Sequence, residues 1–225
     1  MTIESSRLEK ALSVVLTACT LVAVVILVEG RFRRASRQDG GSRVEKLKNW
    51  SSTIERVGAP ITPLGAIVKV AVFTDFECPY CRALDSALLA MESLHPGRME
   101  RQVIHFPLRG HSFARRAAAA FECASAQGMA RRMHDHLYRV QPAFDQLDWS
   151  ALGAAIELRN PEAFDMCMAD SSRSARIDSG VKLARELKLS GTPVVVVNDW
   201  LFDPASAESV ERAVTAVMAG RSPKP

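Results

Sequence analysis

The chain has 225 residues, of which 48% are hydrophobic and 24% are charged, and its formal net charge is +4. This length accommodates one domain of ordinary size together with an attachment segment. The positive charge is small and is either scattered or placed beside the first hydrophobic segment, which argues against a nucleic-acid-binding surface.

The first predicted element is a hydrophobic helix at residues 11–28, which contain no charged side chain. A helix of this length just crosses a bilayer core of about 30 Å. A cleaved signal peptide is one alternative, but residues 28–32 match a cleavage site poorly. A buried helix of a soluble domain is another, although such a helix normally carries a polar stripe. We therefore expect one uncleaved anchor at residues 1–30 that contacts the lipid bilayer through residues 11–28.

The flanking charges and the cysteine chemistry predict opposite orientations of this anchor. Two basic side chains precede the segment and four follow it within residues 31–37, so the positive-inside rule places the C-terminal domain in the cytoplasm. The cysteines described below favour an oxidising compartment. Because large domains translocate despite flanking charge, we expect an extracytoplasmic, periplasmic domain against this charge bias.

Residues 31–59 are polar and basic and contain Gly40, Gly41 and Ser42, which predicts a stalk with at most a short helix near residues 44–50. Ordered structure is expected to begin near Pro60. The apolar, β-branched run at residues 67–73 predicts a strand buried on both faces.

The rest of the chain divides into two αβ parts around a long helical stretch. A predicted helix at residues 82–95 and a second strand at residues 101–106 complete a βαβ unit with the first strand. Strands at residues 194–197 and 200–202, a turn between them and a last helix at residues 207–219 form a ββα unit. The helices between the two units are expected at residues 112–127, 129–141, 148–159, from 160 onward, and 174–189.

Cys78 and Cys81 stand where the first buried strand gives way to a helix. Pro79 suits the first helical turn, so Cys78 is predicted at the helix N-terminus, where unpaired N–H groups and the helix dipole favour a thiolate. Such a position lowers a cysteine pKa from about 8.5 to between roughly 3.5 and 7.5. Cys81, one turn later, is expected to be more buried and to resolve a mixed disulfide. The redox group is thus the cysteine pair, and no cofactor is expected.

Two other roles of a CxxC pair compete with redox chemistry. A zinc site needs two further ligands at suitable spacing, and the sequence has no second CxxC motif and no paired histidines at zinc-finger spacing. We therefore predict no metal. A purely structural disulfide is the second alternative, but exposed neighbouring cysteines stabilise a fold poorly.

Residues 73–81, FTDFECPYC, resemble the active-site stretch of the DsbA-like thiol–disulfide oxidoreductases of the thioredoxin superfamily. Gly191, Thr192 and Pro193, followed by a valine run, resemble a second motif of that family. Intervening features fall in the family order: Pro107-Leu108, His111, Cys123 in an alanine-rich helix, Gln127-Gly128, His134-Asp135 and Cys167. The resemblance covers roughly residues 60–219.

The resemblance implies an α/β thioredoxin-like fold, βαβ plus ββα, with an inserted all-helical subdomain. It implies a cis Pro193 facing the cysteine pair and a Thr192 whose backbone binds a cysteine-containing protein substrate, with Pro79 and Tyr80 as further substrate contacts. Glutaredoxins share the motif CPYC, but lack an insertion as long as the 115 residues between Cys78 and Pro193.

The chain departs from the family pattern at two positions. Val72 stands six residues before Cys78, where thioredoxin and DsbA carry a buried acid, and Asp75 and Glu77 are the closer acids. Val194 replaces a frequent threonine. Both departures bear on the redox potential and leave the reaction type unchanged. His111 is assigned a cap or surface role in preference to contact with the cysteine pair.

The predicted organisation has six parts. They are an anchor at 1–30, a stalk at 31–59, the first half of the core at 60–110, the helical insertion at 111–186, the second half of the core at 187–219, and a tail at 220–225. Within the insertion, the family resemblance implies a structural disulfide between Cys123 and Cys167, with two reduced core cysteines as the alternative. A bridged pair would place the domain in an oxidising space.

The expected function is disulfide exchange with protein substrates through Cys78 and Cys81, in the disulfide-forming direction. A membrane or thiol redox partner would reoxidise the pair. The alternatives are a disulfide reductase or isomerase of the same fold, and a non-catalytic thioredoxin-like binding module.

Overall fold

The computed structural model of the protein describes residues 42–170 and 175–224. The predicted membrane segment at residues 11–28 lies outside the described residues. Within the two described stretches, none of the helices is both long enough and apolar enough to span a bilayer.

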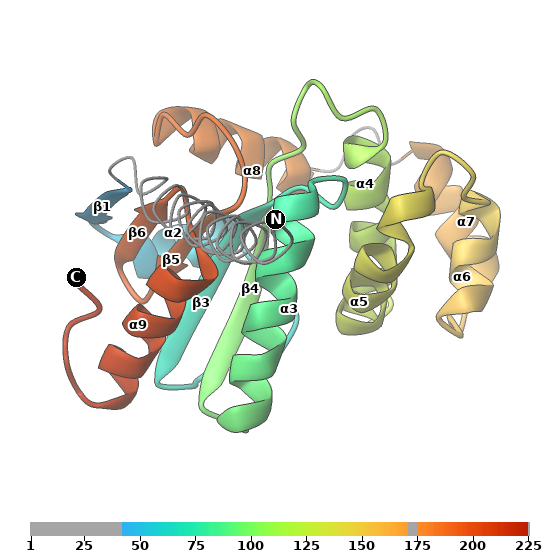
Figure 1. Ribbon diagram of the computed structural model, residues 1–225. Helices are drawn as coiled ribbons and strands as arrows, with labels where there is room; N and C mark the ends of the chain where they lie inside the picture. The colour runs from blue at the N-terminus through green and yellow to red at the C-terminus, as the bar shows by residue number, and fades with distance from the viewer. Residues whose placement is uncertain (1–41, 171–174, 225) are drawn as a thin grey trace, which may run out of the picture. The chain divides into compact units, whose positions relative to one another are not determined.

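In this part of the chain six strands form one mixed sheet in the order β1-β6-β5-β3-β4-β2 (Figure 1). The strands are β1 (Arg43–Lys46), β2 (Ala59–Pro60), β3 (Val68–Thr74), β4 (Met99–His105), β5 (Val194–Val197) and β6 (Trp200–Asp203). Strands β3 and β4 are parallel, and the other neighbouring pairs are antiparallel. The two halves of the fold therefore meet where β5 pairs with β3.

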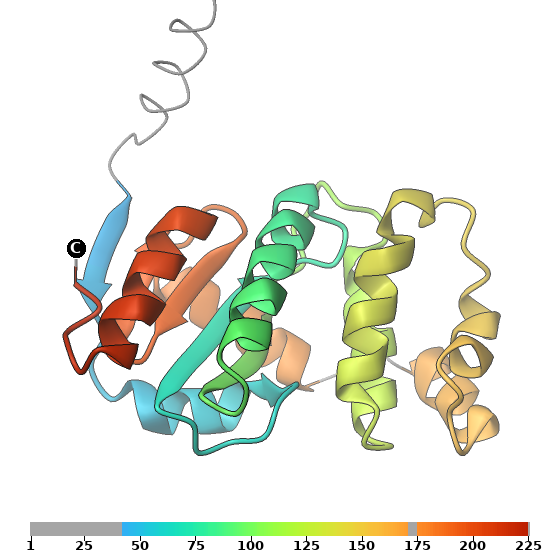
Figure 2. The same cartoon turned by 60° about the horizontal axis from the view of Figure 1, so that its bottom comes forward.

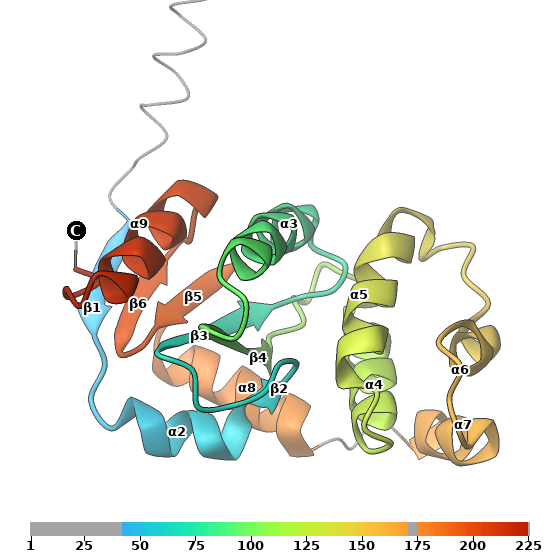
Figure 3. The same cartoon turned by 90° about the horizontal axis from the view of Figure 1, so that it is seen from below.

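Strand β3 is buried on both faces except at Lys69, as its nearly continuous apolar sequence predicts. Val68, Val70 and Val72 share a hydrophobic cluster with side chains of α3 (Pro79–Leu94) and α9 (Ala207–Met218). The alternate residues Ala71 and Phe73 share another cluster with side chains of α2 (Trp50–Val57) and α8 (Ala175–Glu186). Figure 3 shows α3 and α9 on one face of the sheet and α2 and α8 on the other. The predicted α/β thioredoxin-like fold is confirmed.

The helical insertion between β4 and β5 is also confirmed. Its elements are α4 (Ala114–Ser125), α5 (Ala130–Val140), the 3₁₀ turns η1 (Gln141–Ala143) and η2 (Trp149–Ala151), α6 (Leu152–Ala155), α7 (Pro161–Asp170) and α8. Helices α4 and α5 pack against each other, and Figure 2 shows them side by side in yellow-green beside the sheet and its helices. The mainly apolar cluster between them includes Phe121, Met133 and Leu137.

The helix expected at residues 148–159 is shorter than predicted. Asp148 does cap its start by accepting a hydrogen bond from the Ser150 N–H at 3.0 Å. The chain then leaves the helix at Glu157, which has a φ of 57°. Leu158 N–H donates to the Gly153 carbonyl at 2.9 Å, the backbone pattern of a Schellman ending. This ending turns Leu158 into the buried cluster of the insertion.

The stalk expected over residues 31–59 is wrong for residues 43–59, which belong to the folded domain. Strand β1 pairs with β6, and β2 pairs with β4. Trp50, Ile54 and Val57 of α2 are buried. The spacing of these three apolar residues is helical, but the edge strand β1 is short and polar, and its partner lies far away in the sequence.

The C-terminal half agrees with the predicted ββα unit. Asn198, with a φ of 53°, starts the turn between β5 and β6. Ser206 caps α9 by accepting a hydrogen bond from the Ser209 N–H. The peptide bond between Thr192 and Pro193 is cis, as the family resemblance implies.

Candidate active site

Cys78 is the N-cap residue of α3, and Pro79 occupies the first helical turn. The backbone N–H groups of Cys81 and Arg82 donate to the Cys78 carbonyl at 3.1 and 3.3 Å, which closes the first turn. The predicted position of Cys78 at a helix N-terminus is therefore correct. A thiolate there faces the positive end of the helix dipole.

Both cysteines are buried, because Cys78 is 3% exposed and Cys81 is 2% exposed. Burial acts more strongly on Cys81, as expected: it is the main cause of the pKa shift of Cys81 and only a secondary influence on the pKa of Cys78. The hydrogen bond from the Cys81 thiol lowers the pKa of Cys78 to about 5. Burial raises the pKa of Cys81 far above its ordinary value. At pH 7 Cys78 is therefore a thiolate while Cys81 keeps its proton.

The second half of the fold brings its loop to the same place. The Cys78 Sγ lies 3.5 Å from the Thr192 carbonyl oxygen, immediately before the cis Pro193. The Thr192 hydroxyl is buried, and hydrogen bonding by Thr192 helps to lower the pKa of Cys78. Beside the pair, Tyr80 is 74% exposed. The fold thus brings Thr192 next to the predicted pair Cys78 and Cys81, although it lies more than a hundred residues later in the sequence.

Asp75 and Glu77, the acids nearest to Cys78 in the sequence, are both engaged in holding the backbone. The Asp75 carboxylate accepts hydrogen bonds from the N–H groups of Glu77 and Leu108, each at 2.8 Å. The Glu77 carboxylate accepts one from the Phe113 N–H at 2.6 Å, at the start of α4. These bonds fasten the loop before Cys78 to the segment that leads into the insertion.

His111 stays partly exposed, as expected of a cap or surface residue, but its side chain also contacts this loop. Its Nδ1 lies 2.7 Å from an Asp75 carboxylate oxygen, and its side chain is 27% exposed. Burial lowers the pKa of His111, but the hydrogen bond and charge of Asp75 more than offset this, so the net pKa is raised. The charge of Cys78 acts in the same direction. His111 therefore belongs to the electrostatic surroundings of the thiolate.

Gln141 was not identified from the sequence, although it holds the loop before α3 directly. Its side-chain amide donates to the carbonyl groups of Phe76 and Cys78 at 2.6 and 3.0 Å, and the residue is 8% exposed. Gln141 begins η1, more than sixty residues from its two partners. A glutamine beside a proline carries no sequence signal for such a contact.

A group of charged side chains that no sequence motif predicts lies behind Cys81; it is buried apart from Arg131 and Asp135, whose side chains are 35% exposed. Arg101, whose side chain is 2% exposed, pairs with Asp85 and Glu92 of α3. Arg131 of α5 pairs with Glu92 at 3.1 Å and with Asp135 at 2.9 Å. His134 lies between Asp85 and Asp135. We call these six residues, Asp85, Glu92, Arg101, Arg131, His134 and Asp135, the buried ion cluster.

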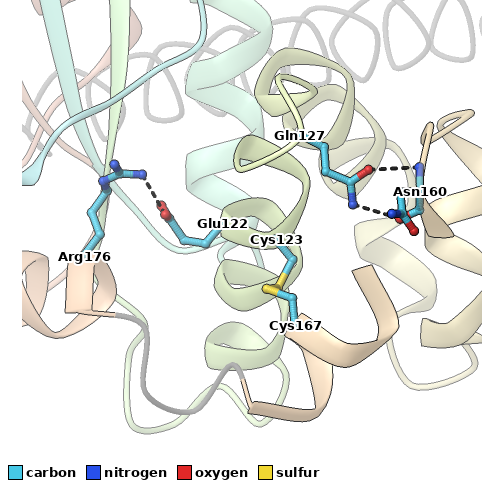
Figure 4. The surroundings of a disulfide bond; sticks show 6 residues. All are labelled: Glu122, Cys123, Gln127, Asn160, Cys167 and Arg176. Atoms are coloured by element: carbon cyan, nitrogen blue, oxygen red, sulfur yellow. Dashed lines mark hydrogen bonds and ion pairs between the residues drawn. A yellow bond between two sulfur atoms is a disulfide. The ribbon is translucent and has the colours of Figure 1, made fainter. Parts of the chain in front are cut away.

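The structure joins Cys123 of α4 and Cys167 of α7 by a disulfide, with a Cα–Cα distance of 5.7 Å. Figure 4 shows two further links beside it. Gln127 and Asn160 exchange side-chain and backbone hydrogen bonds, and Glu122 pairs with Arg176 of α8. The three links join α4, or the turn directly after it, to later segments. As for the zinc alternative, the described stretches contain no group of three His, Cys, Asp or Glu side chains that could hold a metal ion.

A family model described as thioredoxin matches residues 63–216. The chain belongs to the thioredoxin family. Within that family it is similar to the probable disulfide bond formation protein D of Bacillus anthracis, with 26% identity over 223 residues that cover 94% of this chain and 97% of that protein. It is also 31% identical over 205 residues to the Na(+)/H(+) antiporter NhaA 3 of Salinispora tropica. That match covers 86% of this chain, and the chain spans only 31% of the length of the antiporter.

Two solved structures share the fold of this chain. BdbD from Bacillus subtilis superposes with a TM-score of 0.65 at 17% identity, over 80% of this chain and 99% of that chain. Proteus mirabilis ScsC in a transitional conformation gives a TM-score of 0.58 at 18% identity, over 96% of this chain and 99% of that chain. The expected resemblance to the DsbA-like thiol–disulfide oxidoreductases is confirmed, because a disulfide bond formation protein matches nearly the whole chain and BdbD shares its fold.

Proposed function

We propose that this protein exchanges disulfides with cysteine-containing protein chains through Cys78 and Cys81, in the direction of disulfide formation. The observation that carries this proposal is the pairing of two cysteines with opposite pKa shifts at the start of α3. Cys78 is the reactive thiolate, and Cys81 is the second thiol of the redox pair. No separate redox cofactor takes part.

In the proposed cycle, a substrate thiolate attacks the Sγ of Cys78 in the oxidised pair. The Cys78–Cys81 bond breaks, Cys81 takes up the electron pair and a proton, and Cys78 becomes disulfide-bonded to the substrate. A second substrate thiolate then attacks the substrate sulfur of this mixed disulfide. The substrate leaves with a new disulfide, and Cys78 departs as a thiolate. The enzyme ends with two more electrons than it began with and needs an oxidising membrane or thiol partner.

The direction follows from the stability of the leaving thiolate. A thiolate with a pKa of about 5 is a good leaving group, and its stability in the reduced enzyme makes the oxidised enzyme a stronger oxidant. The name of the Bacillus anthracis relative, a disulfide bond formation protein, points the same way. The backbone at Thr192 lies beside Cys78 and would bind the substrate chain. Pro79 and the exposed Tyr80 would flank it.

The proposed location is the outer side of a membrane, with residues 11–28 as the anchor. Four arginines within residues 31–37 argue for the opposite orientation. The disulfide between Cys123 and Cys167 supports the extracytoplasmic side, because structural disulfides persist in oxidising compartments. The lipid bilayer and a membrane-bound oxidant are thus the proposed partners.

Two measurements test the function. Glutathione titration of the full chain in detergent gives the reduction potential, and oxidative refolding of a reduced, disulfide-containing substrate gives turnover. We expect a potential nearer to the value of about −120 mV known for DsbA than to about −270 mV for thioredoxin. Cys78→Ser should abolish turnover. A potential near the thioredoxin value would indicate a reductase, and turnover that survives Cys78→Ser would exclude Cys78 as the reactive group.

A further inference from the structure

Cys81 exchanges one proton in each half-cycle of the proposed function, on which this inference rests. When the Cys78–Cys81 bond breaks, the Cys81 sulfur departs with the electron pair and must gain a proton. When the bond forms again, the Cys81 thiol must lose that proton. Cys81 is 2% exposed, and burial raises the pKa of its thiol far above the ordinary value, so its sulfur is poorly solvated. The proton therefore needs a path through the protein.

We propose that Asp85 and His134 transfer the proton of Cys81 between a small cavity and the open groove that separates α3 from α5. Both residues belong to the buried ion cluster. Asp85 lies one helical turn after Cys81, so the two side chains share a face of α3. His134 comes from the helical insertion, on α5.

The first observation is the cavity itself. A space of about 10 Å³ is lined by Cys81, Thr74, Asp85, His134 and Tyr138, together with apolar side chains, Arg101 and Gln102. This volume holds about one water molecule, and the few polar groups in the mainly apolar lining are its hydrogen-bond partners. Thr74 and Tyr138 are already hydrogen-bonded to each other through their hydroxyl groups. Cys81 thus shares a small space with a carboxylate and an imidazole.

The second observation is the placement of His134 between two carboxylates. Its Nε2 lies 3.4 Å from an Asp85 oxygen, and its Nδ1 lies 3.0 Å from an Asp135 oxygen. The imidazole of His134 therefore has a carboxylate within reach of each ring nitrogen. It links Asp85, which lines the cavity, to the more exposed Asp135.

The third observation is that the same residues reach solvent. An open groove of about 540 Å³ is lined by Asp85, Asp135 and Tyr138, with Pro79, Arg82, Leu89 and Arg139 among the other lining residues. The Asp85 side chain is 12% exposed, and that of Asp135 is 35% exposed. Asp85 and Tyr138 line both the cavity and the groove. The route therefore runs from Cys81 through Asp85 and His134 to Asp135 and water.

The other acids near the cysteine pair do not offer this route. Asp75 and Glu77 accept hydrogen bonds from backbone N–H groups that fasten the loop, and neither lines the cavity of Cys81. Val72, which does line the cavity, has no titratable group. Asp85 is the one carboxylate in that lining.

The test separates the two thiols by time. Reduced full-length protein is mixed rapidly with excess 5,5′-dithiobis(2-nitrobenzoate). Attack by the Cys78 thiolate releases one thionitrobenzoate in a phase that depends on reagent concentration. Cys81 then loses its proton and attacks the Sγ of Cys78, which forms the Cys78–Cys81 bond and releases a second thionitrobenzoate in a concentration-independent phase. The second phase reports the proton step.

Asp85→Asn should leave the first phase nearly unchanged and slow the second by about a hundredfold, the size expected for loss of an internal base. The rate of its second phase should also rise in proportion to hydroxide, whereas the unmodified protein should show a nearly level profile around pH 7. Asp135→Asn, at the more exposed end of the route, should slow the same phase. The Asp135→Asn variant tests the same route if Asp85→Asn does not fold.

Glu122→Gln is the matched control. Glu122 has a 13% exposed side chain and pairs with a buried histidine, His105, and with Arg176, but it does not line the cavity. The second phase of the Glu122→Gln variant should be unchanged. Equal slowing by Glu122→Gln, or an unchanged second phase in both Asp85→Asn and Asp135→Asn, would overturn the proposal. Absence of the first phase in the unmodified protein would instead contradict the proposed function of Cys78.

Discussion

At the scale of single residues, closeness in sequence is a poor guide to the role of an acid near Cys78. Asp75 is three residues away, yet its carboxylate is fully buried and holds two backbone N–H groups and His111. Asp85 is seven residues away, yet it lines the cavity of Cys81. The first acid determines the shape of the loop, whereas the second is placed to take part in proton transfer.

The depressed pKa of Cys78 predicts how the stability of the reduced protein depends on pH. The pKa falls from 9.0 to about 5 on folding, so between these values the unfolded chain binds a proton that the folded chain does not. The free energy of unfolding should therefore rise as the pH rises from about 5 towards 9, and should lose this contribution as the pH falls through 5. The raised pKa of Cys81 has no effect in this window, because its thiol is protonated in both states below about pH 9.

Urea denaturation of the protein in excess dithiothreitol, at a series of pH values, measures this slope. Cys78→Ser is the control, because it keeps every other titrating group and removes the thiol. The difference in unfolding free energy between the two proteins should grow with pH. A difference that stays constant from pH 5 to 9 would show that Cys78 is not acidified by the fold.

The cysteine pair, Thr192 and the cis Pro193 could be recognised from sequence because each belongs to a short, ordered motif. The contacts of Gln141, His134 and Asp85 could not, because they depend on how α5 and η1 dock onto α3. The sequence places His134 on a helix but gives no information about the side chains opposite it. Long-range contacts between polar residues follow from docking geometry rather than from local pattern.

At the scale of elements, the docking of α8 on the sheet depends on one residue without a side chain. A Cβ atom added to Gly180 would lie 2.3 Å from the carbonyl oxygen of His105, in β4. Gly180 lets the backbone of α8 approach the strand that closely. Gly180→Ala should therefore lower the free energy of unfolding by about 1–3 kcal/mol, the usual cost of overpacking.

Gly191→Ala is the matched control for this prediction, because a Cβ atom at Gly191 would have no neighbour within 4 Å. That variant should change the stability by about 0.5 kcal/mol or less. Urea denaturation of both variants in the oxidised state gives the comparison. Equal effects of the two substitutions would mean that α8 can shift away from β4 at little cost.

Periodicity identified most elements but misjudged residues 43–59. The run of four valines in β5 and the apolar run of β3 are strong strand signals, and both are correct. The short strand β1 has the sequence RVEK, and its first two residues are only half-buried. Such an edge strand carries no alternating apolar pattern, so only its partner β6 reveals it.

At the scale of the whole molecule, the site of Cys81 depends on both parts of the fold. Its cavity takes Thr74 from β3, Asp85 from α3, Arg101 from β4, and His134 and Tyr138 from the insertion. The insertion is in turn held together by the Cys123–Cys167 bond, which closes a loop across 44 residues. In the chain-entropy model such a bond stabilises a fold by about 4 kcal/mol. Reduction of this bond would therefore destabilise the insertion, which supplies His134 to the proposed proton route.

This dependence leads to a prediction about the protein in its cell. Cells are quenched with acid, free thiols are alkylated with N-ethylmaleimide, and the protein is then reduced and alkylated with a reagent of different mass. We expect Cys123 and Cys167 to carry only the second label, because the extracytoplasmic side keeps structural disulfides oxidised. Cys123→Ser is the control, because it frees Cys167, which should then carry the first label. First-label modification of both cysteines in the unmodified protein would place the domain in a reducing compartment, in agreement with the arginines at residues 31–37.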